Sequence, residues 1–239
     1  MRLQVFLSHS RVCSRRKALV LVTQGQVRVN GIIIQEPSYD VNADLDRVCL
    51  GNKEITLPQK SYVMLHKPRG FVTTLQDKYA RHTVMDLLPE AYKDLYPVGR
   101  LDKDSEGLLL FTNDGDFAFR LLHPRFKVDK EYFVEIEGCL AKEDSARLER
   151  GVVIDGRRTH QAKVVLAYAH TKRSAVHITI HEGRKRQIRR MLESVGYKVI
   201  RLTRVQYGPL RLGNLPPGKW RLLEKSEVES LVEEVNHGI

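Results

Sequence analysis

The first part of the chain shows two helical patterns followed by strand patterns. Apolar residues recur at helical spacing over 3–7 and again over 18–22, and Ser14 is a suitable N-cap for the second helix. The predicted apolar faces are formed by Leu3, Phe6 and Leu7 in the first helix and by Ala18, Leu19 and Val22 in the second. Residues 27–33 predict two strands joined by an Asn30-Gly31 turn, a strong hairpin signal. Further short strands are expected over 47–50 and 54–57.

Beyond a linker at 58–61, strand patterns dominate. Alternating or continuous apolar runs predict strands over 62–67, 70–74, 108–112, 130–137 and 174–181. Residues 184–195 predict a helix whose apolar face is formed by Ile188, Met191, Leu192 and Val195. Because strand runs outnumber βαβ repeats, we expect an α+β fold with a largely antiparallel mixed sheet flanked by helices. The pattern divides the chain into a small domain, 1–57, and a larger one, 62–239.

Charge is segregated along the chain. The formal net charge is +11, which favours a polyanionic partner, most commonly nucleic acid. The stretch 1–35 contains no acidic residue, and its basic residues are Arg2, Arg11, Arg15, Arg16, Lys17 and Arg28. A solvated charged face is the ordinary interpretation of such a run, but a long acid-free stretch favours RNA binding.

Several classes of protein are not supported. No apolar run reaches the roughly 18 residues of a membrane-spanning helix, and the start of the sequence lacks the apolar stretch of a signal peptide. We therefore expect a cytoplasmic protein without a membrane partner. Cys13, Cys49 and Cys139 lie far apart without CxxC spacing, so we expect packing residues and neither disulfides nor a zinc site. The sequence contains no glycine-rich nucleotide-binding loop of the GxGxxG or GxxxxGK(S/T) type.

The N-terminal segment RLQVFLSHSRVCSRRKALVLVTQGQVRVNG resembles the S-four RNA-binding domain, with SRRKA and VRVNG as its anchors. The resemblance covers about the first fifty residues and implies binding to structured RNA. It implies RNA contacts for Arg15, Arg16, Lys17 and Arg28. Helix N-termini, such as the one expected at Ser14, also favour phosphates.

The segment GRLDKDSEGLLLFTNDG is a polar loop, bracketed by glycines, that runs into an apolar strand. A single Asp in such a loop usually belongs to a solvated turn. This segment, however, resembles the catalytic motif of bacterial ribosomal pseudouridine synthases that carry an S-four domain at the amino end. HKPRGFVTT before it, and DKEYFVEIEG, EGRKRQIRRML and RLTRVQYGPLRLGNLPPGKWRLL after it, match the same family in the same order. The resemblance spans nearly the whole chain.

The resemblance implies isomerisation of uridine to pseudouridine in ribosomal RNA, which needs no cofactor and no metal. It also implies a monomer whose partner is ribosomal RNA within a ribosomal subunit or an assembly intermediate. QIRRM and the long C-terminal block are more similar to the large-subunit enzymes than to the small-subunit enzyme. We therefore favour the large-subunit RNA as substrate.

The same resemblance implies a set of catalytic residues. Asp102 acts at the ribose, either as nucleophile or as the base that removes a proton beside the anomeric carbon, and the sequence leaves both roles open. Burial would raise the pKa of this carboxyl group, so a cation must stabilise its charge, and Arg189 is the matching family residue. Tyr132 is expected to stack on the target uracil, although a strand aromatic packed in the core is its alternative. Arg100 is expected to hold the target nucleotide outside the RNA helix.

Other basic residues are expected to bind phosphates. One group is Arg184, Lys185, Arg186 and Arg190, on the predicted basic helix. The other group is His66, Lys67 and Arg69, for which an ordinary surface position is the alternative. Two further functions compete with the isomerase: a non-catalytic ribosome-binding or assembly protein, and a hydrolase that pairs Asp102 with Asp104. Two acids one residue apart in a loop, with Lys103 between them, are weak evidence for the hydrolase.

Overall fold

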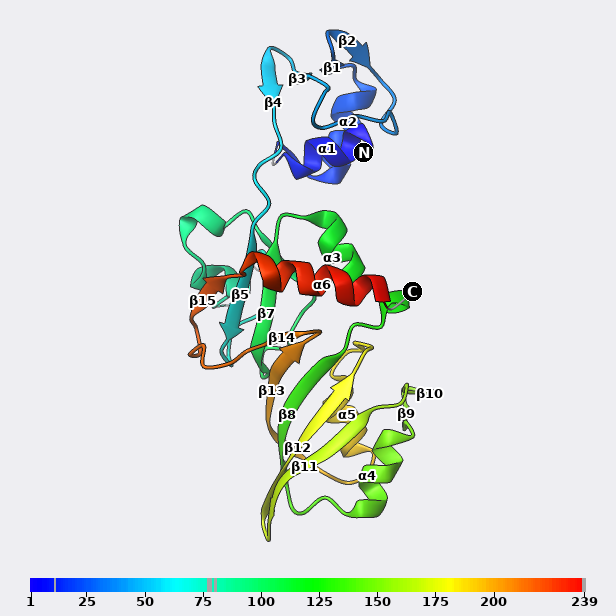
Figure 1. The fold of residues 1–239 in the computed structure, drawn as a ribbon, viewed down its shortest axis with the longest axis vertical. Helices are drawn as coiled ribbons and strands as arrows, with labels where there is room; N and C mark the ends of the chain where they lie inside the picture. The colour runs from blue at the N-terminus through cyan, green and yellow to red at the C-terminus, as the bar shows by residue number, and fades with distance from the viewer. Residues whose placement is uncertain (11, 77–78, 80, 238–239) are drawn as a thin grey trace. The chain divides into compact units, whose positions relative to one another are not determined.

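The computed structural model describes residues 1–10, 12–76, 79 and 81–237. The chain forms two compact units, one made of residues 1–61 with 113–115 and the other of 62–112 with 116–239 (Figure 1). We call these unit 1 and unit 2. Arg11, one of the predicted basic residues, lies outside the described residues.

Unit 1 packs two short helices against a small antiparallel sheet. Its helices are α1 (Leu3–His9) and α2 (Arg15–Thr23), and its strands are β1 (Val27–Val29), β2 (Ile32–Ile34), β3 (Val48–Leu50) and β4 (Lys53–Ile55). The sheet order is β2-β1-β3-β4. Ser14 caps α2 by accepting a hydrogen bond from the Lys17 backbone N–H at 3.3 Å, as predicted. Asn30 and Gly31 both have positive φ, which is the geometry of a two-residue hairpin turn.

Unit 2 is built on one long, mostly antiparallel sheet. Its strands are β5 (Tyr62–Lys67), β6 (Tyr96–Val98), β7 (Glu106–Thr112), β8 (Lys130–Glu137), β9 (Val153–Ile154), β10 (Arg157–Arg158), β11 (Lys163–His170), β12 (Arg173–Ile180), β13 (Val199–Tyr207), β14 (Leu210–Arg211) and β15 (Trp220–Leu222). The main order is β11-β12-β8-β13-β7-β5-β15, and β9 and β10 form a separate hairpin. Only the β13–β7 pair is parallel among the strand pairs of the described residues. The predicted α+β fold with a largely antiparallel sheet is therefore confirmed.

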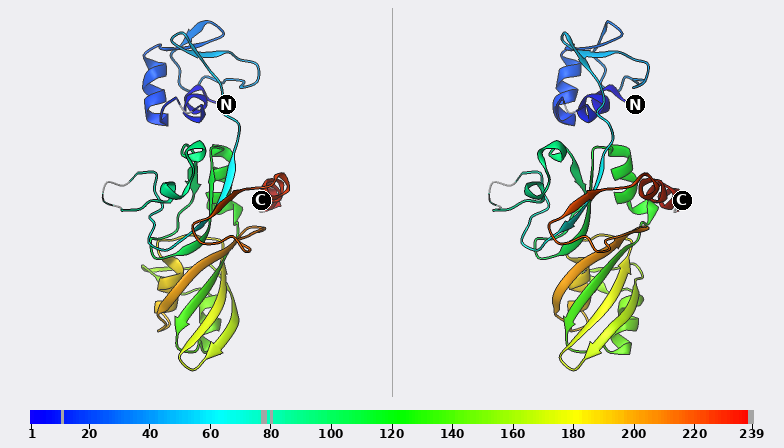
Figure 2. Two further views of the ribbon diagram at one scale, coloured as in Figure 1. Left: turned by 90° about the vertical axis from the view of Figure 1, so that its left-hand side faces the viewer. Right: turned by 60° about the vertical axis from the view of Figure 1, so that its left-hand side comes forward.

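Helices cover the sheet from different sides. They are α3 (Gly115–Leu122), α4 (Lys142–Glu149), α5 (Gln187–Glu193) and α6 (Lys225–His237), with 3₁₀ turns at Val84–Leu87, Glu90–Tyr92 and Pro124–Phe126. Figure 2 shows α6 on one side of β5 and β7 and the 84–95 segment on the other. Each side has its own apolar core, one including Leu108 and Leu110 and the other Leu109 and Phe111. The strand β7 is thus buried on both faces.

Three local predictions were wrong. Residues 70–74 form no strand, because Gly70 has φ +92° and the side chain of Thr73 bonds to the loop at Leu101. The helix predicted over 184–195 begins only at Gln187, since Arg186 has a left-handed backbone, although its predicted apolar face is buried as expected. On α2, Ala18 and Val22 are buried but Leu19 is exposed.

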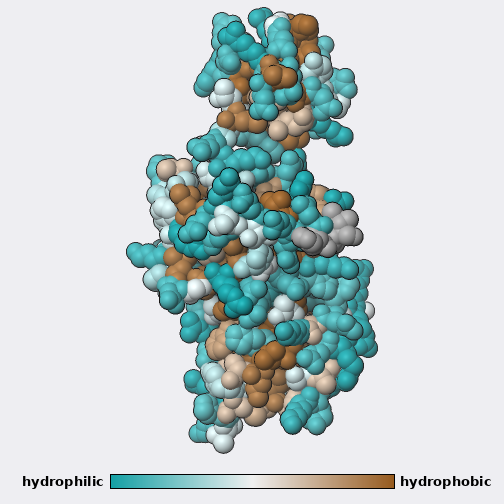
Figure 3. Space-filling model, viewed as in Figure 1, coloured by the Kyte–Doolittle hydropathy of each residue, from teal (hydrophilic) through white to brown (hydrophobic). Residues whose placement is uncertain are grey.

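Most of the surface visible in Figure 3 is hydrophilic, and an apolar patch lies in the lower part of unit 2, over β8, β11 and β12. The edge strand β11 contributes Val165 and Leu166, which are both about half exposed. Among the helices that the structure describes, none is long and apolar enough to cross a membrane.

Candidate active site

Asp102 lies in the loop between β6 and β7, and this loop is bounded by two glycines with positive φ, Gly99 and Gly107. Gly107 is the more constrained of the two. A Cβ atom at this position would overlap the backbone of Arg204 on the parallel neighbour β13. The sequence therefore needs glycine here both for the backbone angle and for the close approach of two strands.

A buried lysine fixes the backbone of the Asp102 loop through hydrogen bonds. Lys67, at the end of β5, is completely buried, and its ammonium donates hydrogen bonds to the carbonyl oxygens of Asp102 at 3.0 Å, Ser105 at 2.8 Å and Pro68 at 3.2 Å. Burial, partly offset by the charge of Asp102, lowers the pKa of Lys67 to about 8. The expectation that Lys67 binds phosphate was wrong, because its three donors are used inside the protein.

The segment after β5 also forms hydrogen bonds with the Asp102 loop. The Thr73 hydroxyl donates to the carbonyl of Leu101 at 2.7 Å and accepts from the Leu101 N–H at 3.3 Å. The Gly70 N–H donates to the carbonyl of Lys103 at 2.8 Å. The motif around Pro68 thus positions the backbone that carries Asp102.

The Asp102 loop opens onto a cavity of about 630 Å³ in unit 2. The predicted residues Arg100, Asp102, Tyr132, Arg184, Lys185 and Arg186 all line it. Leu101, Lys103, Ser105, Gln187 and Ile188 also line it and were not predicted as site residues. Its volume lies within the range of small-molecule sites, so it has room for one extruded nucleotide base with its sugar.

The Asp102 carboxylate is free. It is half-buried, and no hydrogen bond or ion pair of its side chain is recorded within the described ranges. Its backbone, in contrast, is fixed through Lys67 and through the Ser105 N–H, which donates to the Asp102 carbonyl at 3.0 Å. A carboxylate held on a rigid loop without a protein partner is available to a substrate.

The predicted pairing of Arg189 with Asp102 was wrong in this structure. Arg189 is buried, and its Nε lies 3.3 Å from Oδ2 of Asp104, without the direction of a hydrogen bond. Its Nη2 donates to the Asp104 carbonyl oxygen at 3.0 Å. Arg186 donates to Oδ1 of Asp104 at 2.9 Å. Arg189 of α5 and Arg186, the residue just before this helix, therefore bind the acid two residues after Asp102, and they fix the loop to that helix.

These contacts determine the charge of Asp104. Burial alone would raise the pKa of this carboxyl group, but the positive charge of Arg189 and the hydrogen bond from Arg186 outweigh it and lower the pKa. Asp104 is thus an ionised structural anion. It is poorly suited to act as the general acid that a hydrolase pairing Asp102 with Asp104 would require.

Tyr132 combines its two predicted environments. It lies on β8 opposite Ile178 and Arg204, and it packs at the edge of two apolar clusters. It is only half-buried, and it lines the cavity together with Asp102. One side of the ring therefore belongs to the core, while part of the ring stays accessible to a base.

The basic residues predicted in unit 1 are exposed. They are Arg15, Arg16 and Lys17 in the first turn of α2, and Arg28 on β1. Within the part of unit 1 that the structure describes, no side-chain partner is recorded for any of them. Three consecutive cations at a helix N-terminus are unfavourable for the helix dipole, which makes a bound anion favourable there.

Asp104 and Thr73 are the positioning residues that sequence reasoning missed. An acid two residues after Asp102, in a chain with five basic residues at 184–190, was a usable signal for Asp104. Thr73 lies in the HKPRGFVTT block, but nothing in that block indicated which residue bonds to the Asp102 loop. No group of His, Cys, Asp or Glu suited to a metal ion occurs among the residues whose placement is described.

Comparisons with known proteins identify the family of this chain. The family model described as RNA pseudouridylate synthase matches residues 61–194, and the model of the S4 domain matches residues 1–46. The chain is 40% identical to the ribosomal large subunit pseudouridine synthase B of Bacillus subtilis (strain 168), over 99% of this chain and 98% of that protein. It is 37% identical to an uncharacterized RNA pseudouridine synthase of Aquifex aeolicus (strain VF5), over 98% and 94% of the two chains.

A crystal structure of a pseudouridylate synthase is also similar, with a TM-score of 0.70 and 29% sequence identity, covering 97% of this chain and 99% of that one. The expected resemblance, fold and enzyme class are therefore confirmed. This chain belongs to the RNA pseudouridylate synthase family and is an RNA pseudouridine synthase, an isomerase with an S4 domain at its N-terminal end.

Proposed function

We propose that this enzyme converts a specific uridine of ribosomal RNA, in the large subunit, into pseudouridine, with Asp102 acting at the ribose of the target. The name of the Bacillus subtilis relative supports the choice of RNA, since 40% identity extends over nearly both full lengths. The QIRRM segment of α5 and the long C-terminal block support the same choice.

The chemistry requires one carboxylate and little else. The bond between N1 of uracil and C1′ of the ribose breaks, the uracil turns, and its C5 bonds to C1′. N1 gains a proton and C5 loses one, so atoms balance without an oxidant or a second substrate. Asp102 either attacks C1′ or removes the proton at C2′, and both roles need an ionised carboxylate with an open side.

The observation that carries the proposal is the difference between two neighbouring acids. Asp104 is bound by Arg186 and Arg189, whereas Asp102 lines the cavity with no recorded side-chain partner among the described residues. Tyr132 lines the same cavity and offers an aromatic surface on which the uracil can stack. Arg189 contributes indirectly, as a buried positive charge beside the loop.

Residues 1–57 form the RNA-binding domain of this proposal, and residues 62–239 form the catalytic domain. Arg15, Arg16, Lys17 and Arg28 bind phosphates, because they are exposed cations without recorded partners in the described chain. In the catalytic domain, exposed Arg100 and Lys185 contact the RNA beside the cavity. Arg184 and Arg186 line the cavity too, but their guanidinium groups already bond to Glu182 and Asp104, so they contribute charge with their remaining donors.

The partner in this proposal is a ribosomal subunit or an assembly intermediate in the cytoplasm, and the enzyme acts as a monomer. A non-catalytic assembly role is not favoured, since the chain belongs to a family of enzymes and keeps the free Asp102. The test is to incubate the protein with large-subunit and small-subunit RNA transcripts and to map pseudouridine in each.

Asp102→Asn is the matched control in this mapping experiment, since it keeps the side-chain size and removes the charge. A new pseudouridine in large-subunit RNA that depends on Asp102 supports the proposal. Modification of small-subunit RNA only, or an active Asp102→Asn enzyme, contradicts it. Deuterium at C2′ of the target separates the two roles of Asp102, because only proton removal at C2′ gives a primary isotope effect.

A further inference from the structure

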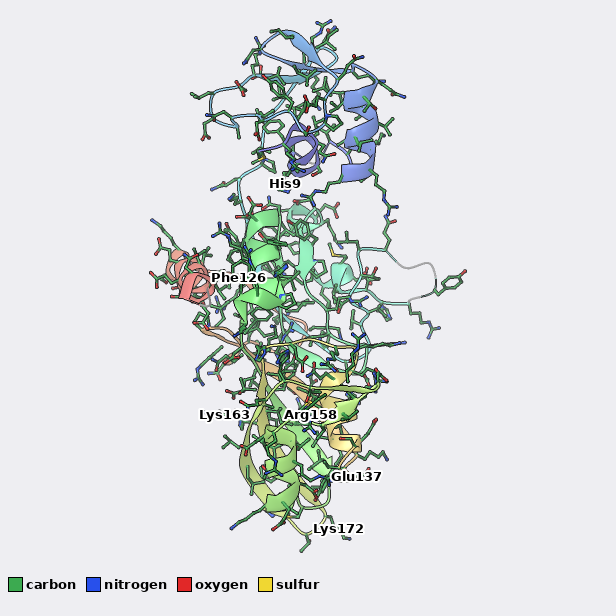
Figure 4. All side chains as sticks on the ribbon, turned by 90° about the vertical axis from the view of Figure 1, so that its right-hand side faces the viewer. His9, Phe126, Glu137, Arg158, Lys163 and Lys172 are labelled. Carbon is green, nitrogen blue, oxygen red and sulfur yellow. The ribbon has the colours of Figure 1, made fainter. Side chains whose placement is uncertain are left out.

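Unit 2 contains a second basic cavity that takes no part in the chemistry described above. It measures about 390 Å³ and is lined by Arg147, Arg150, Gly151, Val152, Val153, Arg158 and Ser194. These residues include three arginines and no acid. Figure 4 faces this side of unit 2 and labels Arg158 close to α4 and α5.

The cavity has a rigid frame. A Cβ atom on Gly151 would overlap the carbonyl oxygen of Thr159, so this glycine allows the end of α4 to pack closely against the segment that follows the β9–β10 hairpin. The Thr159 N–H donates to the Val152 carbonyl at 2.8 Å, and the Val152 N–H donates to the Thr159 hydroxyl at 3.1 Å. Arg158 donates to the Gly151 carbonyl at 2.9 Å, which fixes its side chain at the wall.

The arginines of this cavity have unused donors. Arg150 is exposed, and its side chain has no recorded partner in the described part of the chain. Arg147 pairs with Asp144 at 3.1 Å through one nitrogen, and Arg158 uses one nitrogen on a carbonyl. A guanidinium carries five N–H donors, so most remain available, and their planar arrangement matches the oxygens of a phosphate. The neighbouring acid Asp155 is already paired with Arg190.

The wall of this cavity is tied to the active site. Arg184 lines the cavity at Asp102, and its guanidinium donates to the carbonyls of Arg157 at 3.1 Å and Arg158 at 2.7 Å. Arg190 of α5 pairs with Asp155 in the turn of the β9–β10 hairpin. The two cavities are therefore joined through Arg184, α5 and the β9–β10 hairpin.

We infer that the cavity lined by Arg147, Arg150 and Arg158 is a binding site for backbone phosphate of the substrate RNA, outside the nucleotide that reacts. The inference rests on the proposed function for the identity of the RNA. Half-exposed Val153 lies among the three arginines and offers an apolar contact to a ribose. A phosphodiester fits better than an isolated small anion, because the cavity is open and its cations come from two separate places, the C-terminal end of α4 with its cap residue Arg150 and the strand β10.

The test compares wild type with the double variant Arg147→Ala/Arg150→Ala, which leaves Arg158 and its structural bond intact. Lys142→Ala, an exposed cation at the other end of α4, is the control for a general loss of charge. The probes are the ribosomal RNA fragment modified by the wild type, with its complete flanking sequence, and the same fragment shortened to the target loop. Binding is titrated over a range of salt concentrations, and pseudouridine formation is followed at saturating RNA.

We expect the double variant to bind the complete fragment roughly tenfold more weakly, with a log–log salt slope smaller by about two units, since each phosphate contact contributes about 0.9. We expect the double variant to bind the shortened fragment as tightly as the wild type does. At saturating RNA it should form pseudouridine at the wild-type rate. An unchanged slope on the complete fragment overturns the inference. The inference is also overturned if Lys142→Ala weakens binding to the complete fragment as much as the double variant does. A third contrary result is that the double variant differs from the wild type only in binding inorganic phosphate, used as a further probe.

Failure of the proposed function gives a different result. In that case the wild type modifies no ribosomal RNA fragment, and the binding series is run with an RNA hairpin carrying a long stem and with its isolated loop. If the double variant has a smaller salt slope than the wild type on the long-stem hairpin, and the same slope on the isolated loop, the result still supports a phosphate site. A double variant that instead loses binding to an acidic peptide, with its RNA slope intact, assigns the cavity to a protein and overturns the inference.

Discussion

Arg189 faces Asp104 and not Asp102, with Nε of the arginine 3.3 Å from Oδ2 of the acid. Because Arg186 holds the other carboxylate oxygen at 2.9 Å, Asp104 joins the Asp102 loop to α5. We expect Asp104→Asn to lower the single-turnover rate by roughly ten- to a hundredfold, since small displacements of a reacting group have effects of this size. RNA affinity should change little. Asp155→Asn, which breaks the more exposed pair with Arg190, is the control and should keep nearly the wild-type rate.

The buried ammonium of Lys67 gives a prediction about pH. Its pKa is about 8 in the folded protein and about 10.4 in an unfolded chain. Between these values the unfolded chain binds more protons, so the unfolding free energy contributed by Lys67 rises with pH. The cost of burying the charge is fully present below about pH 8. We expect the stability difference between wild type and Lys67→Met to shift towards wild type from about pH 7 to about pH 10, measured by urea unfolding. A constant difference would contradict the buried charge.

The accessible part of Tyr132 predicts an order of effects. Tyr132→Leu should slow turnover more than Tyr132→Phe, because loss of an aromatic stack on a base costs roughly 1–3 kcal/mol. A separate loss in the Phe variant would reveal a role of the hydroxyl group in proton transfer. Thermal unfolding of both variants shows whether the core is intact. Wild-type turnover in both would assign Tyr132 to the core alone.

The exposed cations of α2 predict a salt effect. Charge reversal at Arg15 and Arg16 should weaken RNA binding and reduce the log–log salt slope, while turnover at saturating RNA persists. Lys53→Glu, a reversal on an exposed strand residue of the same unit, is the control. If the slope stays unchanged in the α2 variant, this helix is an ordinary solvated surface.

Gly107 predicts a large loss of stability. Its φ is +110°, and a Cβ atom would overlap the backbone of Arg204, so Gly107→Ala should lower the unfolding free energy by more than about 3 kcal/mol. Gly138 also has positive φ but open space around it, and Gly138→Ala should cost only about 1 kcal/mol. Denaturant unfolding of both variants measures the difference. Equal losses would mean that backbone angle alone, and not the contact with β13, determines the need for glycine.

Local signals predicted the elements that depend on local chemistry. The Ser14 cap and the Asn30-Gly31 turn are confirmed, because a helix cap and a hairpin turn are determined by a few adjacent residues. The helix at Arg184 was predicted too long, since Arg186 adopts a left-handed backbone and turns its side chain to Asp104. The conformation of Arg186 therefore depends on Asp104, a residue 82 positions away in the sequence. A local sequence pattern does not contain this information.

The same distinction applies to the site. The residues around Asp102 could be assigned from a motif, and the structure brings Arg100, Tyr132 and Lys185 to one cavity with it. Lys67 looked like a surface cation in the sequence, and its burial under the loop depends on how β5 and β7 pair. The residue type alone does not distinguish a lysine exposed to solvent from a buried lysine that donates hydrogen bonds to three carbonyl oxygens.

The bonds from Lys67 and Thr73 reach the backbone of the Asp102 loop and leave its carboxylate untouched. The scaffold and the reacting group are therefore separable. An Asp102→Ala protein should fold and bind its RNA without converting the target uridine. When the RNA has a crosslinkable base at the target, this variant becomes a reagent for isolating the bound RNA from a mixture. The chemistry of one side chain can thus be removed while recognition remains available for study.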